Sequence, residues 1–202
     1  MSFHPRIEYA TFHRSERKLA DAGEDFAYTP ENQRAFDEIV TRYPSDQRKS
    51  AILYALYLAQ AQGGGYLTAA AMRHVAEQIR CTPAEVEDVV SYYTMFYTKP
   101  VGTYVLNVCR TLSCALLGAE RVTEERSSAL GIRPGETDPS GTFTLIEVEC
   151  LGACDRAPIV MVNDDWHERL APEDVRDFIE NIRARGAAAF TGCHLHVEKA
   201  SN

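Results

Sequence analysis

The sequence predicts an α+β protein in which a small helical bundle precedes a mixed β-sheet covered by helices. Up to about Pro100 the chain carries helix-start signals followed by apolar residues at helical spacing. From about Thr103 the pattern changes to short apolar runs bounded by turn residues, which is typical of strands. With 202 residues the chain is long enough for both parts. We therefore expect a helical region at 1–100, a sheet domain at 101–186 and a flexible tail at 187–202.

Start signals mark the helices of the first part. Thr29 offers a capping hydroxyl before Pro30, whose missing N–H costs nothing at the first position of a helix. Thr82 is followed by proline and, three residues later, by Glu85, which together make a capping box. The four expected helices begin at Pro30, near Ser45 or Asp46, after Thr68 and at Pro83; the first ends before Pro44 and the second at Gly63-Gly64-Gly65.

In the second part, strands alternate with helices. Tyr104–Val108 is expected to be a buried strand ending at Cys109, and Thr142–Glu149 a strand ending at Cys150. Because a helix is expected between them, at Ala115–Leu130, the two strands should run parallel. Two further strands, at Ile159–Val162 and Trp166–Arg169, should form a hairpin, and a closing helix is expected at Pro172–Arg185. This order predicts a mixed sheet of thioredoxin-like type.

Composition and charge exclude several classes of protein. Lys and Arg number 21 against 29 Asp and Glu, so the net charge is −8, and no basic run is present to bind nucleic acid. The longest apolar stretch, Ala51–Ala59, is far shorter than the roughly 20 residues of a membrane-spanning helix. The first residues lack the apolar region of a secretory signal peptide. We expect a protein of a reducing, cytosolic compartment.

The chain has six cysteines, and four of them follow expected strands. Cys109 and Cys114 form a C-x4-C pair after the first strand, and Cys150 and Cys154 form a C-x3-C pair after the next. If these strands are parallel, both pairs leave the sheet at the same edge. Disulfides are rare in a reducing compartment, so four neighbouring thiols favour a metal centre. The absence of any C-x-x-C sequence disfavours a thiol–disulfide oxidoreductase.

The spacing of these cysteines leaves the metal open between zinc and an iron–sulfur cluster. Both bind four thiolates, and zinc accepts pairs spaced by two to four residues. A binuclear cluster is wider and suits longer loops, in which Gly152 allows close approach of the backbone and Thr111 and Ser113 offer hydroxyl donors. Arg110 and Arg156, each close to a cysteine in the sequence, could offset the negative charge of such a cluster.

Longer motifs resemble the E-subunit family of NADH-quinone oxidoreductase, the small iron–sulfur subunit of the NADH-oxidising module of respiratory complex I. They are Val86–Phe96, Val108–Cys114, Gly131–Thr137, and Phe143-Thr144 followed after five residues by Cys150–Pro158. The resemblance implies a helical N-terminal part and a thioredoxin-like [2Fe–2S] ferredoxin domain. It implies one [2Fe–2S] cluster with Cys109, Cys114, Cys150 and Cys154 as ligands. Ser140 stands where the family usually has Asp, and we expect this difference to affect a loop and not the cluster.

The same resemblance implies an electron-transfer subunit of an oxidoreductase, with no catalytic residues or substrate site of its own. FMN and NADH are expected on a partner flavoprotein subunit, and other peripheral-arm subunits are further expected partners. The implied location is peripheral, on the cytoplasmic side of a bacterial inner membrane. Alternatives are the same module in an NAD-linked hydrogenase or formate dehydrogenase, or a zinc-stabilised structural subunit. The tail segment Cys193–His196 lies outside the resemblance and is expected to be mobile and without a site.

Overall fold

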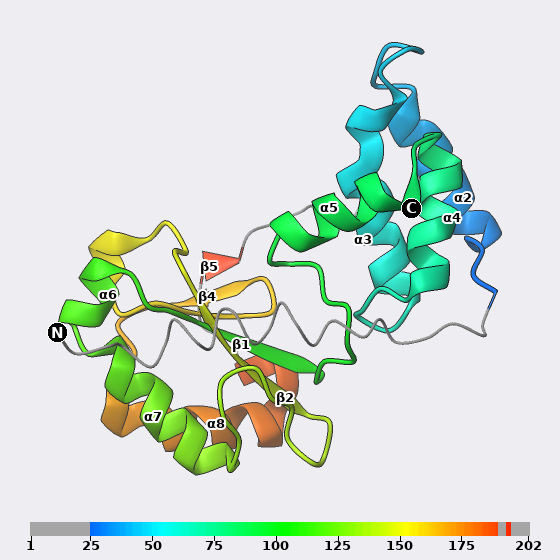
Figure 1. Ribbon diagram of the computed structural model, residues 1–202. Helices are drawn as coiled ribbons and strands as arrows, with labels where there is room; N and C mark the ends of the chain where they lie inside the picture. The colour runs from blue at the N-terminus through cyan, green and yellow to red at the C-terminus, as the bar shows by residue number, and fades with distance from the viewer. Residues whose placement is uncertain (1–24, 190–192, 195–202) are drawn as a thin grey trace, which may run out of the picture. The chain divides into compact units, whose positions relative to one another are not determined.

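The computed structural model describes residues 25–189 and 193–194 (Figure 1). The chain divides into two compact units, Met1–Pro100 and Val101–Asn202. Each unit buries its own cluster of apolar side chains, so each has the hydrophobic core that an independent fold needs. Within the described ranges, no helix combines the length and the apolar character needed to cross a bilayer.

The first unit is helical, and most of its helices start where the capping residues predict. Its elements are α2 (Pro30–Val40), η1 (Arg48–Ala51), α3 (Ile52–Gln62), α4 (Ala69–Ile79) and α5 (Pro83–Tyr92). The hydroxyls of Thr29 and Thr68 accept the N–H groups of Asn32 and Ala71 at the starts of α2 and α4. The predicted start near Ser45 or Asp46 is wrong: the Pro44 carbonyl accepts the N–H of Gln47 in a turn, so the chain becomes helical only at Arg48.

The capping box at Thr82 is complete and adds an ion pair. The Thr82 hydroxyl accepts the N–H of Glu85, and the Glu85 carboxylate accepts the N–H of Thr82 at 2.9 Å. The same carboxylate pairs with Lys49 of η1. The Lys49 ammonium and then the Thr82 donors lower the pKa of Glu85 to about 2. The start of α5 is therefore stabilised by the capping box within its first turn and by the ion pair with Lys49 of η1.

Replacing Thr82 by Ala should lower the free energy of unfolding of the helical unit by about 1 kcal/mol, because the N–H of Glu85 loses its acceptor. Since the folded pKa of Glu85 lies below its ordinary value of 4.5, the Glu85 contribution is present above that pH and is lost as the pH falls toward about 2. Urea unfolding followed by circular dichroism measures both effects. Thr94→Ala, at an exposed position outside the helices, is the control. An equal loss in both variants would contradict the capping role.

The second unit is built on a five-stranded sheet in the order β2-β1-β3-β4-β5. Its elements are β1 (Tyr104–Cys109), α6 (Leu112–Leu116), α7 (Ala119–Leu130), β2 (Phe143–Val148), η2 (Cys154–Arg156), β3 (Val160–Val162), β4 (Asp165–His167), η3 (Pro172–Asp174), α8 (Val175–Arg185), η4 (Gly186–Ala189) and β5 (Cys193–His194). β1 and β2 pair in parallel, whereas β1–β3, β3–β4 and β4–β5 are antiparallel. The predicted mixed sheet and its hairpin are confirmed.

One expected helix is divided in two. The sequence predicts a continuous helix over Ala115–Leu130, but the structure has α6 and α7 with a break at Gly118. Gly118 adopts a φ of 94°, which favours glycine and ends the helical path. The break gives α6 its own direction, and Figure 1 shows α6 at the end of the sheet where β1 stops.

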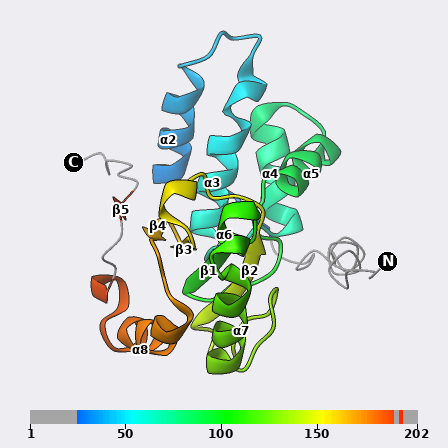
Figure 2. The same cartoon turned by 90° about the vertical axis from the view of Figure 1, so that its left-hand side faces the viewer.

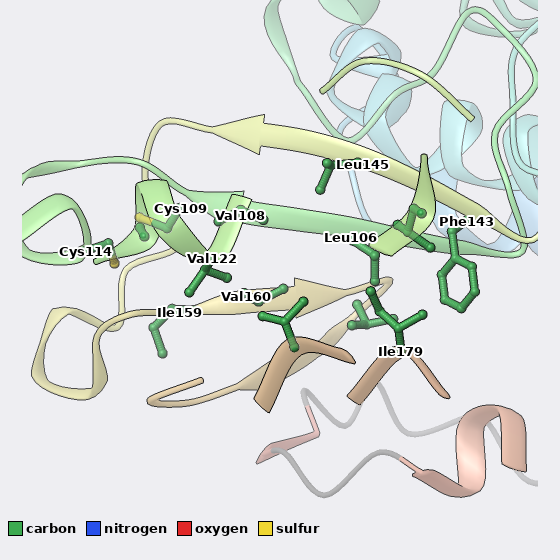
Figure 3. Packing of buried hydrophobic residues seen from close by; sticks show 14 of the residues in the cluster. Leu106, Val108, Cys109, Cys114, Val122, Phe143, Leu145, Ile159, Val160 and Ile179 are labelled. Carbon is green, nitrogen blue, oxygen red and sulfur yellow. The ribbon is translucent and has the colours of Figure 1, made fainter. Parts of the chain in front are cut away.

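The core of this unit lies between the sheet and the two longer helices. Figures 1 and 2 show α7 and α8 along the same side of the sheet, and the two helices pack on each other. The close-up in Figure 3 shows Leu106 and Val108 of β1 facing this layer, with Val122 of α7 and Ile179 of α8 packed against it. The thiols of Cys109 and Cys114 belong to the same buried cluster.

The expected flexible tail begins with ordered backbone. Gly186–Ala189 form η4, and Cys193–His194 pair with Asp165 and Trp166 of β4. The side chains of Cys193 and His194, together with residues 195–202, lie outside the described residues. The mobility of the tail and its lack of a site remain predictions.

Candidate metal centre

Parallel pairing of β1 and β2 brings the two cysteine loops to one edge of the sheet. Cys109, the last residue of β1, lies opposite Val148, the last residue of β2. Cys150 follows Val148 by two residues, so both loops begin where the strands end. The Cys109 thiol lies 3.6 Å from the carbonyl oxygen of Glu149, directly before the second loop. The predicted common edge is therefore confirmed.

The first loop supplies two buried thiols. Thr111 precedes α6, and its hydroxyl lies 3.1 Å from Cys109 Sγ. Burial raises the pKa of Cys109, but hydrogen bonds from Thr111, the Leu151 N–H and Cys114 together hold this pKa below its ordinary value. Burial raises the pKa of Cys114 to about 11, and the Cys109 and Cys154 sulfurs add to that rise. The environment thus favours the anionic form of Cys109 over that of Cys114.

The second loop supplies two exposed thiols. The N–H of Gly152 points at Cys150 Sγ at 3.4 Å, and Gly152 has a φ of 74°, which favours glycine. Cys154 begins η2 and lies near enough to Cys114 to influence its pKa. Cys150 and Cys154 are exposed, whereas Cys109 and Cys114 are buried, and all four are free thiols. The centre thus has one pair facing the core and one pair facing solvent.

The four thiols fit an iron–sulfur cluster by their chemistry. Thiolates are the ligands of [2Fe–2S] clusters, which take them as two pairs on separate irons. Such clusters require polar groups directed at their sulfur atoms. Here these groups are the backbone N–H groups of Leu151 and Gly152 and the Thr111 hydroxyl. Among the described residues, no group of three or more His, Cys, Asp or Glu side chains is arranged as a metal-ion site.

The two nearby arginines are already paired with carboxylates. Arg110 forms an ion pair with Glu149, and Arg156 forms ion pairs with Glu168 and Asp155. The sequence indicated that these arginines could offset the charge of a cluster. In the structure each of them is neutralised within the chain, so neither brings a net positive charge to the cysteine loops.

Ser140 affects a loop at the opposite end of β2. Its hydroxyl donates to Asp138 Oδ2 at 2.7 Å, while Asp138 Oδ1 accepts the N–H groups of Thr142 and Phe143. Burial raises the pKa of Asp138, but the hydrogen bonds from Ser140, Phe143 and Thr142 outweigh it, so the pKa is lowered. Sequence reasoning missed Asp138, although an aspartate a few residues before a strand is a recognisable turn signal.

Cys81 lies in the helical unit, whereas the two cysteine loops belong to the sheet unit. It is half-buried before α5, and burial raises its pKa, as expected for a small packed side chain.

Comparison with known proteins gives one consistent family. The profile of the thioredoxin-like [2Fe–2S] ferredoxin family matches residues 36–183. The E-subunit of NADH-quinone oxidoreductase from Rickettsia bellii is 38% identical over 159 residues, covering 79% of this chain and 95% of that protein. The mitochondrial NADH dehydrogenase [ubiquinone] flavoprotein 2 of Dictyostelium discoideum is 39% identical over 158 residues, covering 78% of this chain and 64% of that protein.

A solved structure agrees with the fold. An NAD+-reducing [NiFe]-hydrogenase chain in the H2-reduced state superposes with a TM-score of 0.58 at 23% identity, over 67% of this chain. This chain spans only 22% of that hydrogenase chain, so the likeness concerns the fold. From the family profile and the Rickettsia relative together, the chain belongs to the thioredoxin-like [2Fe–2S] ferredoxin family and, within it, to the E-subunit family of NADH-quinone oxidoreductase.

Proposed function

We propose that Cys109, Cys114, Cys150 and Cys154 hold the [2Fe–2S] cluster of this family, and that the chain is an electron-transfer subunit of an NADH-oxidising module. The observation that carries this proposal is the parallel pairing of β1 and β2, which opens both cysteine loops at one edge of the sheet. The relatives named as subunits of NADH-quinone oxidoreductase support the choice of module.

The residues around the thiols suit a one-electron centre. When bound, the cluster supplies one-electron storage, whereas NADH gives up two electrons as hydride to the flavin expected on a partner. Thr111 and the N–H groups of Leu151 and Gly152 stabilise negative charge on sulfur. Cys109 and Cys114 are sealed in the core, so exchange with a partner uses the exposed side, at Cys150 and Cys154.

The partner that follows from this role is the subunit that carries FMN and NADH. Further peripheral-arm subunits surround it in the module, which lies at the cytoplasmic side of a bacterial inner membrane. The membership of the chain in the E-subunit family supports both proposals. The acidic net charge of −8 agrees with a protein partner and not with nucleic acid.

Analysis of the purified chain tests the cluster, and analysis of the assembled module tests the role. We expect about two irons and two acid-labile sulfides per chain, with an electron paramagnetic resonance signal that develops on reduction by dithionite. Zinc without sulfide would contradict the cluster.

In the co-purified module, identification of the flavoprotein separates a respiratory complex from a hydrogenase or formate dehydrogenase. A cluster that NADH never reduces there would contradict electron transfer.

A further inference from the structure

Arg126 of α7 is a charged side chain buried in the core of the second unit. It is 0% exposed and has the largest volume among the fully buried side chains of the described residues. Its three guanidinium nitrogens have no hydrogen-bond partner within the part of the chain that the structure describes. The guanidinium carbon lies 5.0 Å from the centroid of the Phe178 ring of α8, which is a cation–π contact. A buried charge held only in this way is rare, because desolvation penalises it.

No carboxylate in residues 25–189 forms an ion pair with this guanidinium. Glu125, its neighbour on α7, is half-exposed and faces Arg176 at 3.9 Å. Burial alone lowers the pKa of Arg126, to about 9, so the guanidinium keeps its proton at neutral pH. Arg126 therefore differs from Arg110 and Arg156, whose charges are paired with carboxylates.

Arg126 lies in the core of the same unit as the buried thiols. It follows Val122 by four residues, which places the two on the same face of α7, one turn apart. Val122, Cys109 and Cys114 belong to one buried cluster, and Figure 3 shows the Val122 side chain in the layer below Cys109. Charges interact more strongly through such an interior than through water, and salt screens them less.

We propose that Arg126 is an electrostatic tuning residue, whose uncompensated charge in the core of the unit that contains Cys109 and Cys114 raises the reduction potential of the [2Fe–2S] cluster. The proposal rests on the cluster assignment made above. Reduction adds one electron, and therefore one negative charge, to the centre, with no bond formed or broken in the protein. A fixed positive charge favours the more negative state, so Arg126 stabilises the reduced form over the oxidised form.

A redox titration of the full chain with its cluster, followed by electron paramagnetic resonance, tests the proposal. Arg126→Met should shift the midpoint potential to more negative values, and Arg126→Lys should restore most of the shift. The matched control is Arg121→Met, because Arg121 is an exposed arginine on the same helix. The control should leave the potential unchanged. The shift in Arg126→Met should persist in high salt, because the charge it removes is buried.

An unchanged potential in Arg126→Met, with a full cluster, would overturn the proposal even if the stability of the protein changed. Arg126→Gln, a second neutral variant, replaces the Met variant if that one does not fold, and the same negative shift is expected. A purely structural role would alter unfolding, followed by fluorescence of Trp166, and leave the potential alone. A wild-type chain without a cluster would instead contradict the proposed function, so the two failures are distinguishable.

Discussion

Cys154→Ala will lose most of the visible absorption and the paramagnetic resonance signal of the cluster, whereas Cys81→Ala will keep both. Alanine offers no ligand atom, so one iron would be left with a missing thiolate. Cys154 is exposed and begins a short 3-10 turn, so its removal costs the fold little. Cys81 is half-buried in the helical unit and is the matched control. Iron, sulfide and the two spectra are measured on each purified variant.

The position of Cys154 makes this a test of the ligand set and not of folding. Substituting Cys109 or Cys114 would also remove a buried side chain, and a lost cluster would then have two explanations. With Cys154→Ala, circular dichroism should match that of the wild-type chain. A full complement of iron and unchanged spectra in this variant would show that Cys154 is not a ligand.

Local chemistry explains why much of this structure could be predicted from the sequence. The caps at Thr29, Thr68 and Thr82 act within one turn of helix, so a few neighbouring residues decide them. The parallel pair followed from a strand, helix, strand order, which restricts the possible topologies strongly. The common edge of the cysteine loops is a consequence of that pairing.

The features that escaped prediction depend on contacts between distant residues. Arg110 and Glu149 are 39 residues apart, and their ion pair forms only because β1 and β2 lie side by side. Arg126 lies on a helix rich in charged residues, where the sequence pattern alone suggests exposure. Its burial depends on how α7 and α8 pack, which no local signal encodes. The break at Gly118 is different, because a glycine inside a predicted helix is itself a local signal.

Leu106→Ala will lower the free energy of unfolding of the sheet unit by about 2–5 kcal/mol, which is the usual cost of a large cavity in a core. Leu106 is 0% exposed in the middle of β1, where it lies opposite Leu145 of β2 and Val162 of β3. Removing its side chain leaves a cavity among these three strands. Leu116→Ala, in the same unit at 77% exposure, should change the free energy by less than about 0.5 kcal/mol.

Trp166 makes this comparison specific to the sheet. It is the only tryptophan of the chain and lies in β4, so its fluorescence in urea follows this unit and not the helical one. Because Cys109 ends the strand that Leu106 stabilises, the Leu106 variant should also release iron faster to a chelator. Equal unfolding midpoints for the two leucine variants would mean that β1 is not the centre of this core. A less stable sheet with unchanged iron release would mean that the cysteine loops are held independently of it.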